Sequence, residues 1–462
     1  MNTTARTELA LRAAPPPGRR APGPNAFGLL SRIRKVHHNP LALLVEDHKT
    51  YGPVVTYRRF DRHMTSFLHP DHVRHVLETH HTNYRRSVIY DKLRPVLGDG
   101  LVTADGPAWQ RQRRLMQPAF ARDRVASVAP VMLDEIAQLE TRLEGFAGQV
   151  VDIAAEMMRL TLRIAGRALF HADVSSQVET IGRALDVALG EVDRRIDEIW
   201  NWPEWLPVSR NRTFNAAVAE LDAIVFDIIR RRRQDPGDVD DVLSILMKVR
   251  DPETGTGMSD RQLRDEVLTL LLAGHETTAN WLAWTWYLLA EHPDVERRLH
   301  GELAQHLSAR APQLSDLPRL SFVRQVADES LRLYPPVWGI DREAIADDVI
   351  GGYHVPAGSI VITSQYLIHR NPEFWPNPER FDPDRFTPEQ VASRPKHAFF
   401  PFGGGPRQCI GQAFAGLETT LILSSIAQRF RFQLEPGFVV DVEPGITLRP
   451  RNGMRMKVIP RE

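Results

Sequence analysis

The only cysteine of the 462-residue chain, Cys409, lies in the stretch AFFPFGGGPRQCIGQAFAGLETT, residues 398–420. Glycines 403–405 permit backbone angles that other residues avoid and let another group come close. Arg407 places a positive charge two residues before the sulfur, and the apolar periodicity after Gly411 predicts a helix. Amide groups at a helix N-terminus and a nearby positive charge favour thiolate over thiol. Such a thiolate is either a nucleophile or a soft metal ligand.

A second chemically unusual segment is AGHETT, residues 273–278, which lies inside a long apolar-periodic stretch. Gly274 costs about 1 kcal/mol relative to alanine in a helix interior, and Glu276 is expensive to bury without a partner. The acid–alcohol pair of Glu276 and Thr277 is suited to relaying protons to a molecule bound beside the helix. The alternative is a kinked helix with a satisfied polar network. A zinc-protease HExxH motif is excluded, because position 279 is alanine.

The element that must carry this pair is a long helix predicted for residues 259–291. Ser259 and Gln262 form a capping-box pattern at its start, and Pro293 stops it. Such a helix has roughly 32 residues and is about 48 Å long at 1.5 Å per residue. Apolar residues occupy nearly all of its faces, so we expect it at the centre of the molecule.

The other periodic segments are mostly helical, with amphipathic patterns at 123–147 and 215–233. Strand-like runs are short and occur at 52–60, 351–364 and 454–460. No internal repeat or low-complexity linker divides the chain. The predicted fold class is therefore mainly α with small β-sheets at the margin.

Composition excludes several classes of protein. The chain has 42% hydrophobic residues, and its 58 basic residues balance 58 acidic ones. A global basic field is absent, so we expect no nucleic-acid partner. A single cysteine forms no internal disulfide. The N-terminal segment contains no apolar stretch long enough for a signal peptide or an anchor. We therefore expect a flexible Pro-rich lead over 1–24, one domain over 25–462, no integral membrane anchor, and a soluble, cytoplasmic protein.

Five motifs resemble those of the cytochrome P450 family. FGGGPRQCIG, from Phe402 to Gly411, matches the haem-binding signature FxxGxRxCxG at every defined position. ESLR at 329–332 resembles the ExxR element, PERF at 378–381 its distal partner, and WQRQR at 109–113 the WxxxR helix. AGHETT resembles the oxygen-activating helix segment. The resemblance implies the cytochrome P450 fold, with a long central helix across a buried haem.

The same resemblance implies a haem b cofactor (iron protoporphyrin IX) with the Cys409 thiolate as the axial ligand of the iron. Phe402 would shield the sulfur. The implied donors to the haem propionates are Trp109, Arg113, Arg342 and Arg407. A buried triad of Glu329, Arg332 and Arg380 would fix the segment behind the cysteine loop.

On the distal side, the resemblance implies that Thr277 and Glu276 deliver protons to iron-bound dioxygen. Glutamate stands here where many relatives carry aspartate. The positions that match the family's substrate pocket are Val102, Ala273 and Val337. Their small apolar side chains favour a hydrophobic substrate, either terpenoid or fatty-acid-like. The matching access lid contains Trp200, Trp202 and Trp205, which would guide an oily substrate, touch a membrane surface, or only pack the lid.

The implied activity is that of a monooxygenase that inserts one oxygen atom from O2 into a C–H bond. No reductase segment follows the last predicted strand, so electrons from NAD(P)H would arrive through separate partners, a ferredoxin and its reductase. Candidate docking residues, which could also be ordinary surface charges, are Arg111, Arg114, Arg394 and Lys396. Two alternatives are a peroxide-driven or rearranging haem-thiolate enzyme and a non-catalytic haem sensor. Neither needs the pair of Glu276 and Thr277.

Overall fold

The computed structural model describes residues 18–24, 39–59, 62–171, 177–198, 203, 205–235, 241–251 and 255–461. Its α-helices are α2 (Pro40–Tyr51), α3 (Pro70–Arg74), α4 (Val88–Asp91), α5 (Arg94–Leu97), α6 (Gly106–Met116), α7 (Arg122–Ser127), α8 (Ala129–Gly145), α9 (Ile153–Phe170), α10 (Val178–Asp197), α11 (Ser209–Gln234), α12 (Val242–Lys248), α13 (Asp260–Glu291), α14 (Pro293–Leu307), α15 (Ser321–Leu333), α16 (Gln365–Ile368), α17 (Pro388–Ser393) and α18 (Gln412–Arg429).

Shorter helical turns and strands complete the described part of the chain. The turns are the π-helix η1 (His75–Thr79) and the 3₁₀-helices η2 (His81–Asn83), η3 (Gln117–Phe120), η4 (Leu317–Arg319), η5 (Pro383–Phe386), η6 (Lys396–Ala398) and η7 (Gly405–Arg407). The strands are β1 (Val54–Arg59), β2 (Arg62–Phe67), β3 (Tyr84–Arg85), β4 (Val150–Asp152), β5 (Ile340–Ala344), β6 (Asp348–Ile350), β7 (Tyr353–Val355), β8 (Ile360–Thr363), β9 (Phe430–Leu434), β10 (Val442–Pro444), β11 (Leu448–Pro450) and β12 (Arg455–Pro460).

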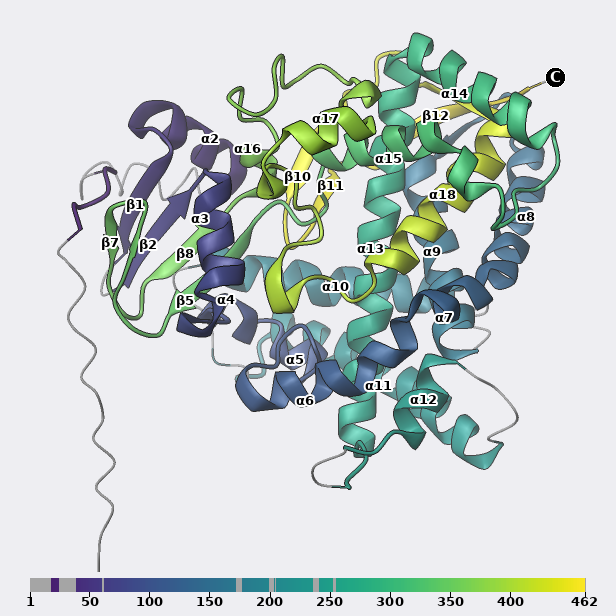
Figure 1. The fold of residues 1–462 in the computed structure, drawn as a ribbon. Helices are drawn as coiled ribbons and strands as arrows, with labels where there is room; N and C mark the ends of the chain where they lie inside the picture. The colour runs from purple at the N-terminus through teal and green to yellow at the C-terminus, as the bar shows by residue number, and fades with distance from the viewer. Residues whose placement is uncertain are drawn as a thin grey trace, which may run out of the picture.

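The fold has a helical side and a sheet side (Figure 1). The largest sheet has the order β1-β2-β8-β5-β3, in which only the β2–β8 pair is parallel. A β4-β12-β9 sheet lies among the helices, and β6–β7 and β10–β11 form separate hairpins. The mainly helical fold with small sheets agrees with the class predicted from the sequence.

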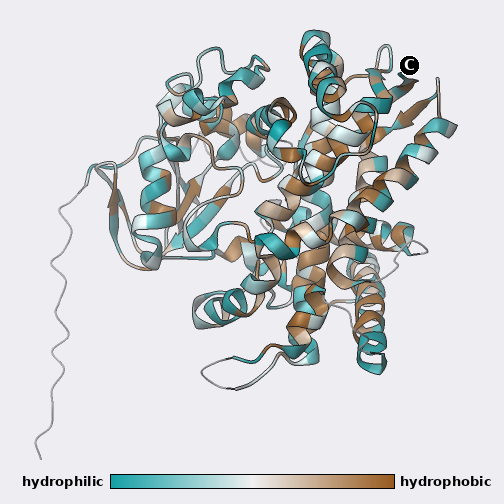
Figure 2. Cartoon of the chain, turned by 45° about the vertical axis from the view of Figure 1, so that its right-hand side comes forward, coloured by the Kyte–Doolittle hydropathy of each residue, from teal (hydrophilic) through white to brown (hydrophobic). Residues whose placement is uncertain are grey.

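Helix α13 runs through the middle of the helical side (Figure 1). Its predicted start and end are confirmed: it spans 32 residues and begins with a capping box. The Ser259 hydroxyl accepts from the Gln262 amide at 3.2 Å, and the Gln262 side chain accepts from the Ser259 amide at 3.0 Å. Most of the helix is buried, and hydrophobic residues run along the central helices in Figure 2.

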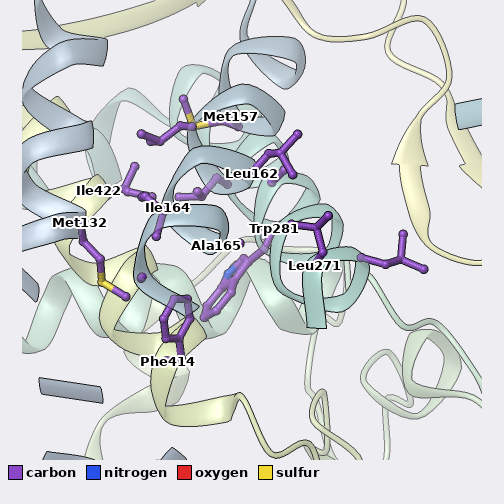
Figure 3. Packing of buried hydrophobic residues seen from close by; sticks show 14 of the residues in the cluster. Met132, Met157, Leu162, Ile164, Ala165, Leu271, Trp281, Phe414 and Ile422 are labelled. Atoms are coloured by element: carbon purple, nitrogen blue, oxygen red, sulfur yellow. The ribbon is translucent and has the colours of Figure 1, made fainter. Parts of the chain in front are cut away.

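Gly274 does not interrupt α13, which stays helical through the AGHETT segment. A Cβ at Gly274 would lie 3.7 Å from the Cβ of Ala165 on α9, in ordinary contact. Figure 3 shows how closely α9, α13 and α18 pack here, with Trp281 and Phe414 beside Ala165. The glycine therefore lies where α13 packs closely against α9, and it does not break the helix.

Two predicted helices have different bounds. The segment 123–147 forms two helices, α7 and α8, which are separated at Val128. Pro130 lies in the first turn of α8. The N–H groups there have no partner within the helix, so proline costs no hydrogen bond and favours a new helix start. The predicted segment 215–233 is confirmed as part of α11.

Of the predicted lead, residues 18–24 contact the sheet side, and residues 1–17 lie outside the described residues. Arg19 forms a bridge with Tyr353 of β7, and the Pro22 carbonyl accepts from the Thr56 amide at 2.7 Å. Gly23 packs directly on the Thr56 carbonyl. Backbone hydrogen bonds to the sheet side thus order this part of the lead, which proline composition alone does not reveal.

Buried apolar side chains form two clusters among the described residues. The larger spans the helices and includes Trp281 and Leu271, whereas the smaller lies under the β1-β2-β8-β5-β3 sheet and includes Phe67 and Val361. None of the described helices has the length and hydrophobicity that crossing a membrane requires.

Candidate active site

A cavity of about 950 Å³ lies between α13 and the loop that carries Cys409. Phe402 and Cys409 line one wall, and Ala273, Thr277 and Trp281 of α13 line another. Most of the remaining lining is apolar, as in sites for hydrophobic small molecules. The structure therefore brings the two chemically unusual segments of the sequence to one cavity.

Glycines shape the cysteine loop. Gly405 has φ +67°, and a Cβ there would lie 1.7 Å from the carbonyl oxygen of Leu77 in η1. Only glycine lets the loop approach η1 this closely. The Cys409 amide donates to the Phe402 carbonyl at 3.0 Å, so the loop turns back on itself and presents the sulfur to the cavity. The Phe402 ring meets Trp281 edge-on, with ring centroids 6.1 Å apart.

The sulfur of Cys409 is open to the cavity although protein surrounds the site. Burial raises the pKa of the Cys409 thiol, whereas a hydrogen bond from the Gly411 backbone and the charge of Arg113 lower it. The helix-terminus effect expected from the sequence is present, but the charge that lowers the pKa is that of Arg113 rather than that of Arg407, and burial outweighs both effects. A bound cation is what would make the thiolate the stable form.

Four arginines line the cavity, and three of them, Arg86, Arg342 and Arg407, lie close enough for their charges to affect one another. Arg86, Arg113, Arg342 and Arg407 all line it, together with Trp109. Burial, together with the charges of Arg86 and Arg342, lowers the pKa of Arg407 to about 9. Burial also lowers the pKa of Arg86, whose Nε has no hydrogen-bond partner.

This arginine cluster has few anionic partners of its own. Arg407 pairs with Asp105, donates to the Ala104 carbonyl at 3.0 Å, and stacks over Trp109 at 4.3 Å. Arg342 donates to the Asp341 carbonyl at 2.7 Å. Buried guanidinium groups that repel one another need a bound anion, and carboxylates suit them because arginine pairs with them through two parallel hydrogen bonds.

On α13, Thr277 and Glu276 lie on different faces. Thr277 lines the cavity, and its hydroxyl donates to the Ala273 carbonyl at 2.8 Å. Glu276 does not line the cavity; its carboxyl oxygen Oε1 accepts from the Thr447 hydroxyl at 2.5 Å. Burial raises the pKa of Glu276, whereas the hydrogen bond from Thr447 and the charge of Arg449 lower it. The predicted pair is thus adjacent in sequence, but only the alcohol faces the cavity.

The predicted apolar positions lie in the same cavity. Val102 comes from the segment before α6, Ala273 from α13, and Val337 from the segment before β5. Of the three lid tryptophans, Trp200 and Trp202 lie outside the described residues, and Trp205 is 80% exposed.

The buried Glu329–Arg332 pair is present, but Arg380 is not its third member. Arg332 donates to Glu329 through Nε at 2.6 Å and Nη2 at 2.7 Å, and both side chains are fully buried. The side chain of Arg380 is exposed, and only its backbone carbonyl accepts from Arg332. Arg385 takes the predicted place, with its Nε 3.5 Å from Glu329 Oε1.

This correction has a simple origin. The chain contains two similar tetrapeptides, PERF at 378–381 and PDRF at 383–386. The sequence does not choose between them. In the structure η5 places the arginine of the second one against α15.

The predicted docking residues all have intramolecular partners. Arg111 and Arg114 each lie 3.2 Å from the carboxylate of buried Asp251. Arg394 stacks on the Trp375 ring at 4.0 Å, and burial lowers its pKa to about 10. Lys396 pairs with Glu78 at 2.5 Å but stays 77% exposed, so it is the most accessible of the four.

Comparison with known proteins decides the family. The family model described as "Cytochrome P450" matches residues 15–456. The chain belongs to the cytochrome P450 family. A crystal structure of the cytochrome P450DA heme domain superposes on this P450 with a TM-score of 0.86 and 28% identity, covering 97% of this chain and 99% of that one. The fold is therefore the cytochrome P450 fold, as the motifs implied.

Several relatives of this P450 are named as oxygenases. Cyclooctatin synthase of Streptomyces melanosporofaciens is 37% identical, covering 92% of each chain. Cyclooctat-9-en-7-ol 5-monooxygenase of the same organism is 36% identical over 93% of each chain. Pentalenene oxygenase of Streptomyces avermitilis is 34% identical over 81% of this chain and 83% of that one. This P450 is accordingly a monooxygenase.

Cytochromes P450 hold a haem by a cysteine thiolate, and the cavity fits that group. The arginine cluster matches the two propionate carboxylates of a haem, and the partnerless Nε of Arg86 is a donor kept for such an anion. Cys409, which also lines the cavity, would supply the soft thiolate ligand for the haem iron. Arg113, Arg342, Arg407 and Trp109 would therefore hold the propionates, together with Arg86.

Sequence reasoning missed three residues of the site. Arg86 carries no motif, and its position at the cavity depends on β3 and β5 pairing. Trp281, one turn beyond Thr277, lines the cavity and donates to the Ala327 carbonyl at 2.8 Å. Trp281 follows Thr277 by one helical turn and therefore lies on the same face of α13, and this spacing could have identified it. Thr447 lies in a terminal hairpin, where no pattern pointed to Glu276.

Proposed function

We propose that this P450 hydroxylates a cyclic terpenoid, inserting one oxygen atom from O2 into an unactivated C–H bond. The observation that carries the proposal is the apolar cavity that Thr277 and Cys409 both line. Fatty-acid-like substrates fit an apolar cavity equally well. The terpenoid class is preferred because relatives over most of the chain are named for cyclooctatin and pentalenene oxidation.

The overall reaction consumes the substrate, O2, two electrons and two protons, and yields the alcohol and water. A thiolate-ligated haem supplies the centre at which O2 is bound and activated. Val102, Ala273 and Val337 would hold the substrate by apolar contact and exclude water around it. A ferredoxin would carry the electrons from NAD(P)H. Its proposed docking site is the face near the cysteine loop, where Lys396 is exposed.

Protons must reach the cavity from the protein. The Thr277 hydroxyl lies in the cavity wall. Its oxygen can accept a proton from the protein while its own hydrogen passes to a molecule in the cavity. Glu276 is the adjacent buried acid, and burial raises its pKa, which favours a carboxyl that still carries its proton. We assign Thr277 as the donor in contact with the reacting atoms and Glu276 as the group that recharges it.

The test is Thr277→Ala in the haem-loaded enzyme with a ferredoxin and its reductase. Cyclooctat-9-en-7-ol serves as the probe substrate. We expect normal haem content and a strongly red-shifted Soret band of the reduced carbon monoxide complex, but more hydrogen peroxide and less alcohol per NAD(P)H oxidised. An unchanged ratio of alcohol to NAD(P)H would reject the role of Thr277. A Soret band typical of histidine-ligated haem would reject ligation by Cys409.

A further inference from the structure

We propose that Thr447 is a positioning residue that holds the acid Glu276 out of the cavity, and that filling the cavity releases the acid through the β10–β11 hairpin turn. The inference rests on the proposed function, because it takes Glu276 as the group that recharges Thr277. It adds a control on proton delivery by a residue 171 positions away in the chain.

The first support is the hydrogen-bond chain around Glu276. The Thr447 hydroxyl donates its only proton to Glu276 Oε1 at 2.5 Å. The Thr447 oxygen in turn accepts from the side-chain amide of Asn280 at 3.1 Å. Asn280 lies one helical turn after Glu276 on α13, and all three side chains are buried. Glu276 is therefore held at a defined place on the side of α13 that does not line the cavity.

The second support is the position of Thr447 in the chain. It follows Pro444, the last residue of β10, and the turn residues Gly445 and Ile446, and all three line the cavity. One short turn thus contacts both the space for the substrate and the acid. A substrate that presses on Gly445 or Ile446 must shift the backbone next to Thr447, because the turn is only a few residues long.

The third support is the way the turn is held. The Ile446 amide donates to Asp193 Oδ1 of α10 at 2.6 Å, and the Trp338 indole donates to the Gly445 carbonyl at 2.8 Å. A Cβ at Gly445 would lie 2.5 Å from Asp193 Oδ2, so α10 and the turn are in close contact. Asp193 and Trp338 also line the cavity. Movement of α10 or of a bound molecule therefore reaches Thr447 directly.

The pKa of Glu276 is raised, which favours a carboxyl group that keeps its proton. Asp186 of α10 raises the pKa of its carboxyl, in the same direction as burial, whereas Arg449 of β11 lowers it. Asp186 itself has a raised pKa because of burial. A protonated Glu276 that is bound to Thr447 cannot reach Thr277 until that contact opens. Coupling the opening to an occupied cavity would prevent proton delivery without substrate.

The experiment compares Thr447→Val, which removes the hydroxyl at nearly constant volume, with Thr447→Ser, which keeps it. Thr420→Val is the matched control, because the Thr420 hydroxyl donates to the Gly416 carbonyl on α18, away from the cavity. The readout is the infrared carbonyl stretch of protonated Glu276 in the haem-loaded ferric protein, assigned by its loss in Glu276→Gln. It requires no turnover.

We expect the Glu276 band of the wild type at low frequency, because its carbonyl oxygen accepts a hydrogen bond. Thr447→Val should move the band to higher frequency, whereas Thr447→Ser and Thr420→Val should not. Filling the cavity of the wild type with 4-phenylimidazole should move the band in the same direction, and Thr447→Val should then show no further movement. A band that Thr447→Val leaves unmoved overturns the positioning role, and a wild-type band that 4-phenylimidazole leaves unmoved overturns the coupling.

A turnover measurement separates this inference from the proposed function. Without substrate, Thr447→Val should release severalfold more hydrogen peroxide than the wild type, and Thr447→Ser should release as little as the wild type. With cyclooctat-9-en-7-ol bound, the contact is open in the wild type too, so the two enzymes should release similar amounts per NAD(P)H oxidised. Absence of any hydroxylated product from the wild type contradicts the proposed function. An active wild type whose substrate-free peroxide release is the same in Thr447→Val contradicts only the role of Thr447.

Discussion

Arg332, which is fully buried, and Arg86, which is half-buried at the cavity, have opposite surroundings. Arg332 donates to both carboxylate oxygens of Glu329 and to the carbonyls of His369, Pro378 and Arg380. Its charge is therefore fully compensated inside the protein, as a structural arginine requires. Arg86 stacks over Tyr90 and feels the charges of Asp341 and Asp105, but its Nε has no partner at the cavity wall, so a bound anion would complete its compensation.

The corrected triad gives a prediction at the residue scale. Arg385→Ala should lower the free energy of unfolding of the haem-loaded protein by about 1–3 kcal/mol, because Glu329 loses a buried charged partner. Arg380→Ala, at an exposed position, should change it by about 0.5 kcal/mol or less. Urea unfolding of both variants measures the difference. Equal losses in the two variants would contradict the assignment of Arg385.

His275 gives a second prediction at this scale, on pH. Burial lowers its pKa to about 4 from 6.5, and its Nδ1–H donates to the Leu271 carbonyl at 2.7 Å. The unfolded chain takes up this proton first, so stability is complete above pH 6.5 and falls as the pH drops toward 4, by up to about 3 kcal/mol. His275→Gln should not show this part of the loss of unfolding free energy at low pH. Unfolding free energies that keep a constant difference between wild type and variant from pH 7 to pH 5 would contradict it.

At the scale of elements, the position of the cysteine loop depends on contacts with three neighbouring helical elements. η1 presents the Leu77 carbonyl to Gly405, η6 presents His397 to Gly404, and α18 starts just after the sulfur. The loop therefore acts as a rigid connection between the sheet side and α18. Its glycines are needed for close approach as much as for their backbone angles.

Gly405→Ala tests this packing. The new Cβ would lie 1.7 Å from Leu77 O at a φ of +67°, so the loop must shift and Cys409 must move with it. We expect loss of haem content and of the red-shifted carbon monoxide band. Gly416→Ala on α18 is the control: no atom lies within 4 Å of its Cβ, and it should stabilise the helix by about 1 kcal/mol. Full haem loading of Gly405→Ala would reject the argument.

At the scale of the whole molecule, the cavity lies between the two hydrophobic clusters. Residues of the sheet side, such as Met64 and Ile360, line it together with residues of α13. The arginine cluster likewise draws Arg342 from β5 and Arg113 from α6. A haem bound there would bridge the two sides, and its removal would leave guanidinium groups that repel one another.

Removal of the haem should therefore loosen the molecule unevenly. Without haem, amide hydrogen exchange should become faster in α6, β5 and the cysteine loop, while the packed interface of α13 and α9 stays protected. Thermal midpoints should rise with added haem, because it binds only the folded chain. Equal acceleration of exchange along the whole described chain would contradict a bridging role.

The sequence by itself determined the cysteine loop, the bounds of α13 and the family, because local patterns carry these features. Capping at Ser259, the stop at Pro293 and the spelling around Cys409 depend on neighbours within a few residues. The apolar positions Val102, Ala273 and Val337 were also recognised by local motif alone, and they lie at one cavity.

Tertiary structure alone decided which partner each buried charge meets. PERF and PDRF have the same pattern, and only the packing of η5 against α15 selects Arg385 over Arg380. Glu276 turns to Thr447 because the β10–β11 hairpin packs beside α13. A buried charge takes the partner that the long-range packing provides, and contacts across such separations leave no periodicity in the sequence.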